Sequence, residues 1–327
     1  MTTKTLAIVS AGFSRGAPRA GSELRPSAIL GSGLLDSLRS LFPDVYLDDE
    51  IPEGADLPHS QDLDFAGMKN LQSVSAATRH VSEKVESYLK AGSVVLTLGG
   101  DHSNAIGSLT GSNKGIREQM NTDIAVICVD AHVSINTPET SPSGNIHGMP
   151  LAFATGVAKV KGDGIFDWIQ KEHLVNTRRL VYIGTRDVDE KEMKILEDHG
   201  IKVFNMEEIR KFAISGHSYH TFTDRYHRNG IEKVMEELFD YIGTSVPVHL
   251  SCDIDVLDPE WAPSAGHLVP GGLSLAEGQY IARRVHATGR LAAMDLVEVN
   301  PTIDLPGVPK TVGSACILIK EALGATE

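Results

Sequence analysis

The chain has little that would place it in a membrane or hold it together with disulfides. Only three of its 327 residues are cysteines. Cys128, Cys252 and Cys316 all lie within apolar stretches, which suits buried thiols in a reducing compartment. No apolar run approaches the roughly 20 residues that span a bilayer, and the run at residues 6–10 is too short for a signal peptide. We therefore expect a cytoplasmic protein with no membrane partner.

The chain is also short of positive charge. It carries 30 Lys and Arg residues against 43 Asp and Glu residues, which gives a formal net charge of -13. Nucleic acids and anionic membranes both demand a basic surface, so this balance disfavours them as partners. A small molecule that is cationic or bound to a metal fits the charge better.

No linker rich in Pro, Gly or Ser divides the chain, and no repeat is evident. Short apolar runs alternate instead with helical stretches, which is typical of an α/β fold with a mostly parallel sheet. A length of 327 residues is tolerable for one doubly wound domain, so we expect a single three-layer α/β/α domain over residues 1–327. The predicted strands are 5–10, 45–47, 93–98, 124–129, 180–183, 203–204, 246–250 and 291–296.

Apolar stripes predict two helices that pack on this sheet, over residues 62–90 and 231–241. Two irregular stretches, residues 137–150 and 257–273, contain prolines and glycines and follow the most polar segments of the chain. We interpret both stretches as loops of an active site.

Three segments place histidines and carboxylates at metal-ligand spacing where predicted strands end. They are GGDHS at residues 99–103, DAHVSIN at 130–136 and SCDID at 251–255. Open α/β sheets bind their ligands at the carboxyl ends of strands. Asp130 and His132 are one residue apart, as are Asp253 and Asp255, so on an extended strand each pair would point to one side. Both pairs could face one cleft.

This pattern indicates a two-metal site. Mixed imidazole and carboxylate ligands suit manganese, whereas zinc is less favoured because the proposed ligands include no thiolate. Two ions about 3.5–4 Å apart can share a water and lower its pKa. Each segment alone could be a capped turn or a solvated strand end. Their coincidence at three strand ends favours the metal site.

The same segments, together with SGNIHG at residues 143–148, make the chain resemble the ureohydrolases and, among them, the arginases. The resemblance extends from Gly21 to Asn300. The loop from Asn136 to His147 is similar to that of arginases, whereas agmatinases share the metal motifs but have a different loop. The resemblance implies an arginase-like fold and the hydrolysis of L-arginine to L-ornithine and urea.

The resemblance also implies two Mn²⁺ ions. His102, Asp130, Asp253 and a carboxylate at position 134 would hold one ion. Asp130, Asp253, His132 and Asp255 would hold the other. In the family, a hydroxide that bridges the ions attacks the guanidinium carbon of arginine, and the tetrahedral intermediate collapses to ornithine and urea.

Catalytic and substrate-binding residues follow from the same resemblance. His147 matches a histidine that shuttles a proton, which suits its pKa near neutrality. Glu298 matches the glutamate that pairs with the guanidinium group, and Asp130 completes the catalytic set. The acidic run at 187–192 is, without the family, most often a helix N-terminus. The implied contacts of the amino-acid part of the substrate are Asn136, Ser143 and Asn145 for the carboxylate and Asp189 and Glu192 for the α-amino group.

Ser134 departs from the family pattern, because arginases carry a second aspartate two residues after the histidine of DAH. A serine hydroxyl is neutral and normally keeps its proton, so it supplies neither charge nor proton transfer well. Two divalent ions would face three aspartates instead of four. We expect weaker occupancy of the first manganese position and a severe drop in turnover, unless another group compensates.

His267 is the second departure, since arginases usually have a threonine there, close to the substrate. A histidine could crowd arginine, donate a hydrogen bond or replace a metal ligand, and it could equally be a solvated loop residue. Three functions stay open: a slow manganese arginase, a non-enzymatic binding or regulatory protein, and a hydrolase of another guanidino compound. The trimers and hexamers of the family imply a homo-oligomer.

Overall fold

A computed structural model describes residues 5–49, 62, 64–158, 164–215 and 225–325 of the chain. Its strands form one sheet in the order β2-β1-β3-β8-β7-β4-β5-β6, and each of these pairings is parallel. The strands are β1 (Leu6–Ala11), β2 (Val45–Asp48), β3 (Val94–Gly99), β4 (Ala125–Val129), β5 (Leu180–Ile183), β6 (Lys202–Phe204), β7 (Val248–Asp253) and β8 (Leu291–Val297).

Every predicted strand is present, so the prediction of an α/β fold with a mostly parallel sheet is confirmed. The largest shift is at β7, which was predicted over residues 246–250 and begins instead at Val248. Pro247 has no N–H to donate to the sheet, which explains the late start. Its carbonyl accepts a hydrogen bond from Ala125 at 2.8 Å.

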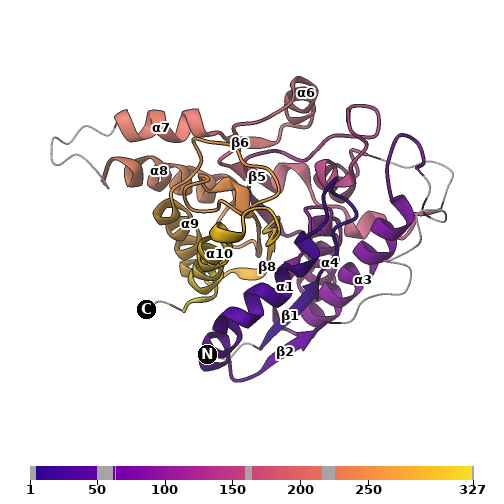
Figure 1. Cartoon of the computed structure of the whole chain (residues 1–327), viewed down its shortest axis with the longest axis horizontal. Helices are drawn as coiled ribbons and strands as arrows, with labels where there is room; N and C mark the ends of the chain where they lie inside the picture. Colours follow the sequence, from indigo (N-terminus) through magenta and orange to yellow (C-terminus); the bar gives the residue numbers. More distant parts are fainter. Residues whose placement is uncertain (1–4, 50–61, 63, 159–163, 216–224, 326–327) are drawn as a thin grey trace.

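Helices cover both faces of the sheet (Figure 1). One apolar cluster lies between the sheet and α1, α2, α7, α8, α9 and α10. A second lies between the opposite face and α3, α4, α5 and α6. The helices are α1 (Arg25–Ile29), α2 (Leu35–Leu41), α3 (Leu71–Lys90), α4 (Asn104–Met120), α5 (Pro150–Thr155), α6 (Glu190–His199), α7 (Met206–Ser215), α8 (Arg225–Ile242), α9 (Leu275–Ala287) and α10 (Val308–Leu323).

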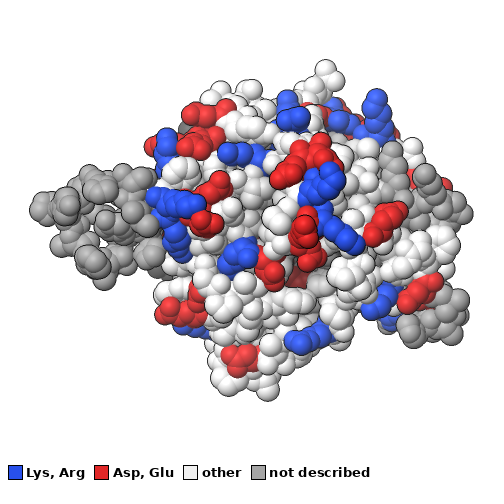
Figure 2. All heavy atoms as spheres, turned by 90° about the horizontal axis from the view of Figure 1, so that it is seen from above, with Lys and Arg blue, Asp and Glu red and all other residues white. Residues whose placement is uncertain are grey.

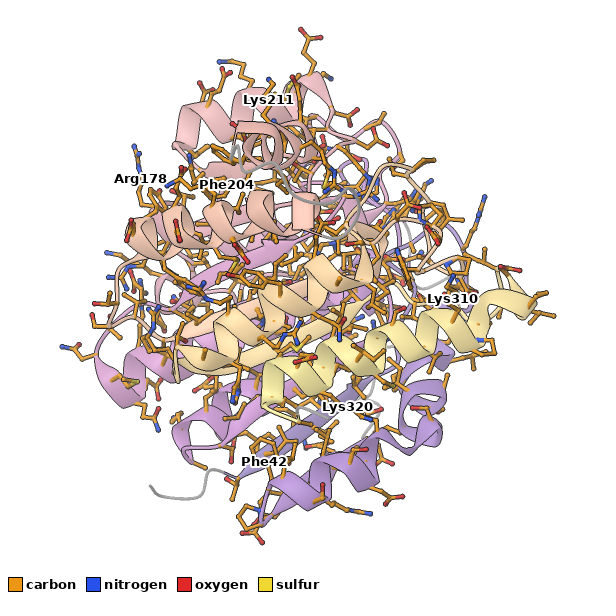
Figure 3. All side chains as sticks on the ribbon, turned by 90° about the vertical axis from the view of Figure 1, so that its left-hand side faces the viewer. Phe42, Arg178, Phe204, Lys211, Lys310 and Lys320 are labelled. Atoms are coloured by element: carbon orange, nitrogen blue, oxygen red, sulfur yellow. The ribbon has the colours of Figure 1, made fainter. Side chains whose placement is uncertain are left out.

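Helices α8, α9 and α10 lie side by side across one face of the sheet (Figure 3). Figure 3 views the molecule from this side, with Lys310 and Lys320 projecting from α10. Phe204, at the end of β6, is buried beneath this layer. The predicted helix over 231–241 lies within α8, and the three-layer arrangement is that expected from the sequence.

The prediction of a helix from residue 62 was wrong at its start, because α3 begins at Leu71. Residue 63 of that predicted range lies outside the described residues. Asn70, just before the helix, has a left-handed backbone with φ of 51°, which breaks the helical path. Asp62 folds back instead and accepts hydrogen bonds from the backbone N–H groups of Gln72 and Ser73 at 2.9 and 3.4 Å. The carboxylate therefore caps the helix from a distance in sequence.

The surface shows no large basic patch on the face that is drawn in Figure 2. On the face in Figure 2, basic and acidic side chains are intermixed and the basic ones do not gather into a continuous patch. Among the described helices, none combines the length and the apolar character needed to cross a membrane.

Candidate metal centre

The predicted site residues meet at the carboxyl ends of four neighbouring strands, β3, β8, β7 and β4. Parallel strands bring these ends to one edge of the sheet, where α/β proteins bind their ligands. The edge holds a cavity of about 230 Å³. It is lined by His102, His132, Ser134, Asn136, His147, Gly148, Asp187, Asp189, Glu192, Asp253, Asp255, His267 and Glu298.

The two predicted pairs, Asp130 with His132 and Asp253 with Asp255, do not lie wholly on extended strands, which corrects the prediction. Strand β4 ends at Val129, before Asp130, and Asp255 lies in a 3-10 turn, Ile254–Val256. The Asp255 N–H donates to Asp253 Oδ1 at 3.0 Å, which folds the chain into this turn. The expected outcome still holds, because both pairs face the same site.

Asp130 lies at the centre of this cluster and faces both histidines. Its Oδ2 is 3.3 Å from His102 Nδ1, and its Oδ1 is 3.5 Å from His132 Nδ1. Asp253 Oδ2 lies 3.4 Å from His102 Nδ1, and Asp255 Oδ2 lies 3.2 Å from His132 Nδ1. The side chains thus form two overlapping groups that share Asp130, as ligands of two neighbouring ions would.

The crowded carboxylates of the cluster favour a bound cation. Burial and the charge of Asp255 raise the pKa of both Asp130 and Asp253. Burial would lower the pKa of His132, but its hydrogen bonds with Asp130 and Asp255 outweigh burial and raise the pKa to about 11. The carboxylates therefore stabilise a positive charge placed between them.

Two buried atoms of the cluster support a metal site directly. Asp130 Oδ2 and His102 Nε2 have no hydrogen-bond partner among the residues that the structure describes. Buried polar atoms normally have partners, so atoms without one point to an unseen ligand. The group Asp130, His132 and Asp255 places one ligand atom from each residue within 4.8 Å of the others. Imidazole and carboxylate donors fit manganese.

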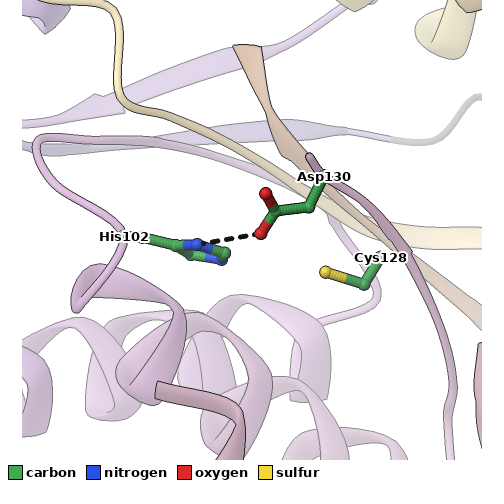
Figure 4. Close-up of side chains that lie close together, drawn as sticks. All are labelled: His102, Cys128 and Asp130. Carbon is green, nitrogen blue, oxygen red and sulfur yellow. Dashed lines mark ion pairs between the residues drawn. The ribbon is translucent and has the colours of Figure 1, made fainter. Parts of the chain in front are cut away.

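Cys128 belongs to a second such group, which the sequence analysis did not anticipate. Its Sγ atom, a ligand nitrogen of His102 and a carboxylate oxygen of Asp130 all lie within 4.8 Å of one another (Figure 4). Cys128 was predicted as a buried thiol, and it is fully buried and not disulfide-bonded. A thiol therefore lies beside the predicted ligands, and burial together with the charge of Asp130 raises its pKa well above the usual value. The signal in the sequence was its spacing, two residues before Asp130.

Glu298 and His147 form a pair at one wall of the cavity. Their Oε1 and Nδ1 atoms lie 3.5 Å apart, and the same Oε1 accepts a hydrogen bond from the His102 N–H at 2.8 Å. Burial would raise the pKa of Glu298, but the hydrogen bond and the charge of His147 lower it. Burial lowers the pKa of His147, and the pairing with Glu298 more than offsets it. Each group therefore favours the charged form of the other.

Asn136, Asp189 and Glu192 lie together on another wall. Asn136 Nδ2 donates to Asp189 Oδ2 at 3.4 Å, and Glu192 Oε1 accepts from the Ile135 N–H at 3.0 Å. Asp189 and Glu192 also form the capping box of α6, so the structural reading of this acidic run is confirmed. Burial raises the pKa of Glu192 to about 7.

Ser143, Asn145 and the fully buried Asp130 are the predicted site residues that do not line the cavity. Ser143 is exposed and accepts a hydrogen bond from the Asn145 N–H at 3.2 Å. Asn145 is 9% exposed and precedes a short 3-10 turn, Ile146–Gly148, that carries His147. The loop that contains both residues thus positions His147 against the cavity.

Both departures from the arginase pattern line the cavity. Ser134 is 7% exposed and has a left-handed backbone with φ of 48°. His267 lies close to the two other histidines of the cavity, with its ring centroid 5.3 Å from that of His147 and 6.0 Å from that of His132. His267 thus lines the cavity and is at the same time an exposed loop residue.

Asp101 and Asp187 are further residues near the site to which the sequence analysis gave no role of their own. Asp101 Oδ2 accepts hydrogen bonds from the N–H groups of Gly16 and Ala17 at 2.8 and 3.0 Å, which fixes an N-terminal loop beside the site. Asp187 Oδ2 lies 3.7 Å from His132 Nε2. The first lies within the GGDHS motif, but the second had no signal beyond the acidic run.

These features define an α/β protein with a candidate two-metal centre at the carboxyl edge of its sheet. The chain belongs to the arginase family, because the model of that family, described as "Arginase family", matches residues 4–219 and 212–324. Its relatives make it an arginase-type ureohydrolase.

An arginase of Coccidioides posadasii is 47% identical over 322 residues, which are 98% of this chain and 94% of that protein. The crystal structure of an arginase from Bacillus subtilis has a TM-score of 0.80 and 33% identity, and the match covers 98% of this chain and 99% of that one. An arginase of Entamoeba histolytica, solved in complex with L-ornithine, has a TM-score of 0.82 and 26% identity, with 99% of each chain covered.

Proposed function

We propose that the chain hydrolyses L-arginine to L-ornithine and urea at this centre. The observation that carries the proposal is the convergence of two imidazoles and three carboxylates, four of which line one cavity together with His147 and Glu298. The likeness to arginases, one of them solved with L-ornithine, supports the choice of an amino-acid substrate.

Two Mn²⁺ ions fit the donor set. His102, Asp130 and Asp253 would hold one ion, and His132, Asp130, Asp253 and Asp255 would hold the other. When bound, the pair of ions would lower the pKa of a water shared between them and so supply the nucleophile. The carboxylates of the chain provide the negative charge that retains two divalent cations.

Glu298 is proposed to bind the guanidinium group of the substrate, since a carboxylate can accept two parallel N–H bonds from it. Its ionised state, which the partner His147 favours, is the state that such binding needs. His147 is in turn proposed to carry a proton between solvent and the leaving amine. It is 17% exposed at the side chain and contacts Glu298, so it reaches both.

The amino-acid end of the substrate is proposed to lie against the opposite wall. Its carboxylate would be held by Asn136, Ser143 and Asn145. Ser143 and Asn145 would act through water, because they do not line the cavity. Asp189 and Glu192 would bind the α-amino group, which requires that Glu192 be ionised when the substrate is bound.

Ser134 is proposed to weaken the first manganese position and to slow turnover. Its hydroxyl lines the cavity but carries no charge, so one position depends on the remaining ligands alone. Asp130, which faces both histidines, would keep its part in the catalytic set.

A second substrate is favoured by His267, which narrows the cavity beside His132 and His147. A guanidino compound smaller than arginine would avoid this imidazole. The function as a binding or regulatory protein would follow if neither compound were hydrolysed.

The test is urea release by the manganese-loaded chain with arginine or agmatine as substrate, with metal content measured on the same sample. We expect urea from arginine and a higher rate with arginine than with agmatine. Faster release from agmatine would contradict the substrate assignment. Absence of urea with two ions bound would contradict the proposed reaction.

Three further properties belong to this proposal. One sheet contains strands from Leu6 to Val297, which supports a single domain. The three buried, unpaired cysteines support a reducing, cytoplasmic location. The family implies a homo-oligomer, a trimer or a hexamer, which sedimentation analysis would test.

A further inference from the structure

Cys128 occupies an unusual place for a structural thiol. It lies on β4 two residues before Asp130, so its side chain points to the same face of the sheet as that carboxylate. That face packs against α3 and α4, beneath the loop that carries His102. The other two cysteines lie elsewhere, Cys252 in the cluster on the opposite face and Cys316 on α10.

The thiol, an imidazole nitrogen and a carboxylate oxygen converge within 4.8 Å (Figure 4). Ligands of one tetrahedral zinc ion lie about 3.5 Å apart, given metal bonds of about 2.0–2.3 Å. A small side-chain shift would therefore bring Cys128, His102 and Asp130 to bonding distance of one cation. Two atoms of these residues, His102 Nε2 and Asp130 Oδ2, are buried and lack a hydrogen-bond partner in the described part of the chain.

The charge of the site also favours a further anionic ligand. Asp253, Asp255 and the neutral residue Ser134 line the cavity, and the fully buried Asp130 lies beside His102 and His132. A thiolate would add a fourth anionic ligand from below. Cations of the zinc class bind thiolates strongly, whereas manganese prefers oxygen ligands.

We propose that Cys128 is a metal ligand that acts with His102 and Asp130, and that this position prefers a zinc-class divalent cation to manganese. When the cation binds, the thiol proton passes to water and the sulfur donates an electron pair to the metal. This inference rests on the proposed function, since it concerns the ion position that Ser134 leaves short of charge.

The test uses Co²⁺ as a spectroscopic probe in the metal-free full chain. A cobalt ion bound to a thiolate gives a strong sulfur-to-cobalt charge-transfer band in the near ultraviolet, and nitrogen or oxygen ligands do not. In the variant with both Cys252→Ser and Cys316→Ser, Cys128 is the only cysteine left. We expect this variant to show the full band of the native chain, at one cobalt–thiolate bond per chain.

The matched variant is Cys128→Ser, with folding checked by circular dichroism. We expect it to lose the band and to lose at least about tenfold in the ratio of zinc to manganese affinity, measured by competition titration. The double variant decides the question even if Cys128→Ser does not fold. Absence of the band in that variant, with cobalt bound, would overturn the inference.

Urea release from arginine by the manganese-loaded chain separates the two proposals. Urea without the charge-transfer band would leave the proposed function intact and overturn the role of Cys128. The band without urea would support the thiolate ligand and contradict the proposed reaction.

Discussion

Ser134 has a backbone that a longer acidic residue could share. Its φ of 48° lies in the left-handed region, which Asn and Asp adopt more readily than most residues. The side chain lines the cavity beside His132. An aspartate at this position could therefore reach the metal centre without a change in the path of the chain.

We expect Ser134→Asp to raise both manganese content and urea release, by about 10–100-fold if a restored ligand is worth at least as much as an outer partner of a ligand. The control is Ser134→Asn, which matches the shape and the backbone preference but adds no charge. It should gain much less. Equal urea release from the native chain and Ser134→Asp would contradict the role assigned to the missing carboxylate.

Glu192 should make stability depend on pH. Its pKa is about 7 in the folded chain against 4.5 for the unperturbed group. Between these values the folded chain keeps a proton that the unfolded chain has released, so stability falls as pH rises through this window. The stability that the protonated Glu192 contributes is full below the pKa of the unfolded chain and is lost above the pKa of the folded chain.

We expect Glu192→Gln to remove this component, measured as the difference in unfolding free energy between native chain and variant in the presence of a chelator. That difference should fall steadily as pH rises from about 4.5 to about 7. A difference that is constant across the window would show that Glu192 does not titrate as the structure implies.

At the scale of elements, a buried polar network joins α4 to β7 and β8 beneath the metal centre. His249 Nε2 lies 2.8 Å from Asp295 Oδ2, and its Nδ1 lies 2.9 Å from Ser112 Oγ. Ser108 and Ser251 also donate to the Asp295 carboxylate, at 2.6 and 2.9 Å. The network fixes the two strands that carry Asp253 and Glu298 relative to the helix that follows His102.

Replacing His249 by leucine should cost about 3 kcal/mol of stability, because it leaves the fully buried Asp295 carboxylate without the imidazole that contacts it. The control Ser112→Ala removes one hydrogen bond from the same imidazole and should cost about 1 kcal/mol. Urea-induced unfolding of the metal-free chain measures both. Equal costs would mean that the contact of the imidazole with Asp295 contributes no more than its hydrogen bond with Ser112.

At the scale of the whole molecule, the metal centre joins segments that are far apart in the chain. His102, Asp130 and Asp253 follow β3, β4 and β7 or end them, and without a cation the crowded carboxylates repel one another. Folding and metal binding should therefore be coupled.

We expect added manganese to raise the unfolding free energy of the metal-free chain. The increase should be about 2.7 kcal/mol for each metal position at a free manganese concentration of 100 times Kd. Thermal denaturation at increasing manganese concentration measures the effect. Asp130→Asn, which removes charge from the shared ligand, should respond weakly. A native chain whose transition temperature ignores manganese would contradict the metal centre.

Local patterns in the sequence determined much of the architecture. The β-branched runs predicted every strand, because side chains buried on both faces of a parallel sheet must be apolar over short lengths. The motifs at their ends predicted which residues form the site, since parallel strands expose these ends at one edge. Ser134 and His267 were also visible as departures from the arginase pattern.

Only the tertiary structure decided which side chains meet. The sequence cannot give the order β3-β8-β7-β4, which depends on packing between distant segments. The same holds for Asp62, which caps a helix that starts nine residues later, and for Cys128, whose thiol comes within reach of His102 only when β4 lies beneath that loop. These contacts arise from the free energy of burying whole elements together, which no local window of residues contains.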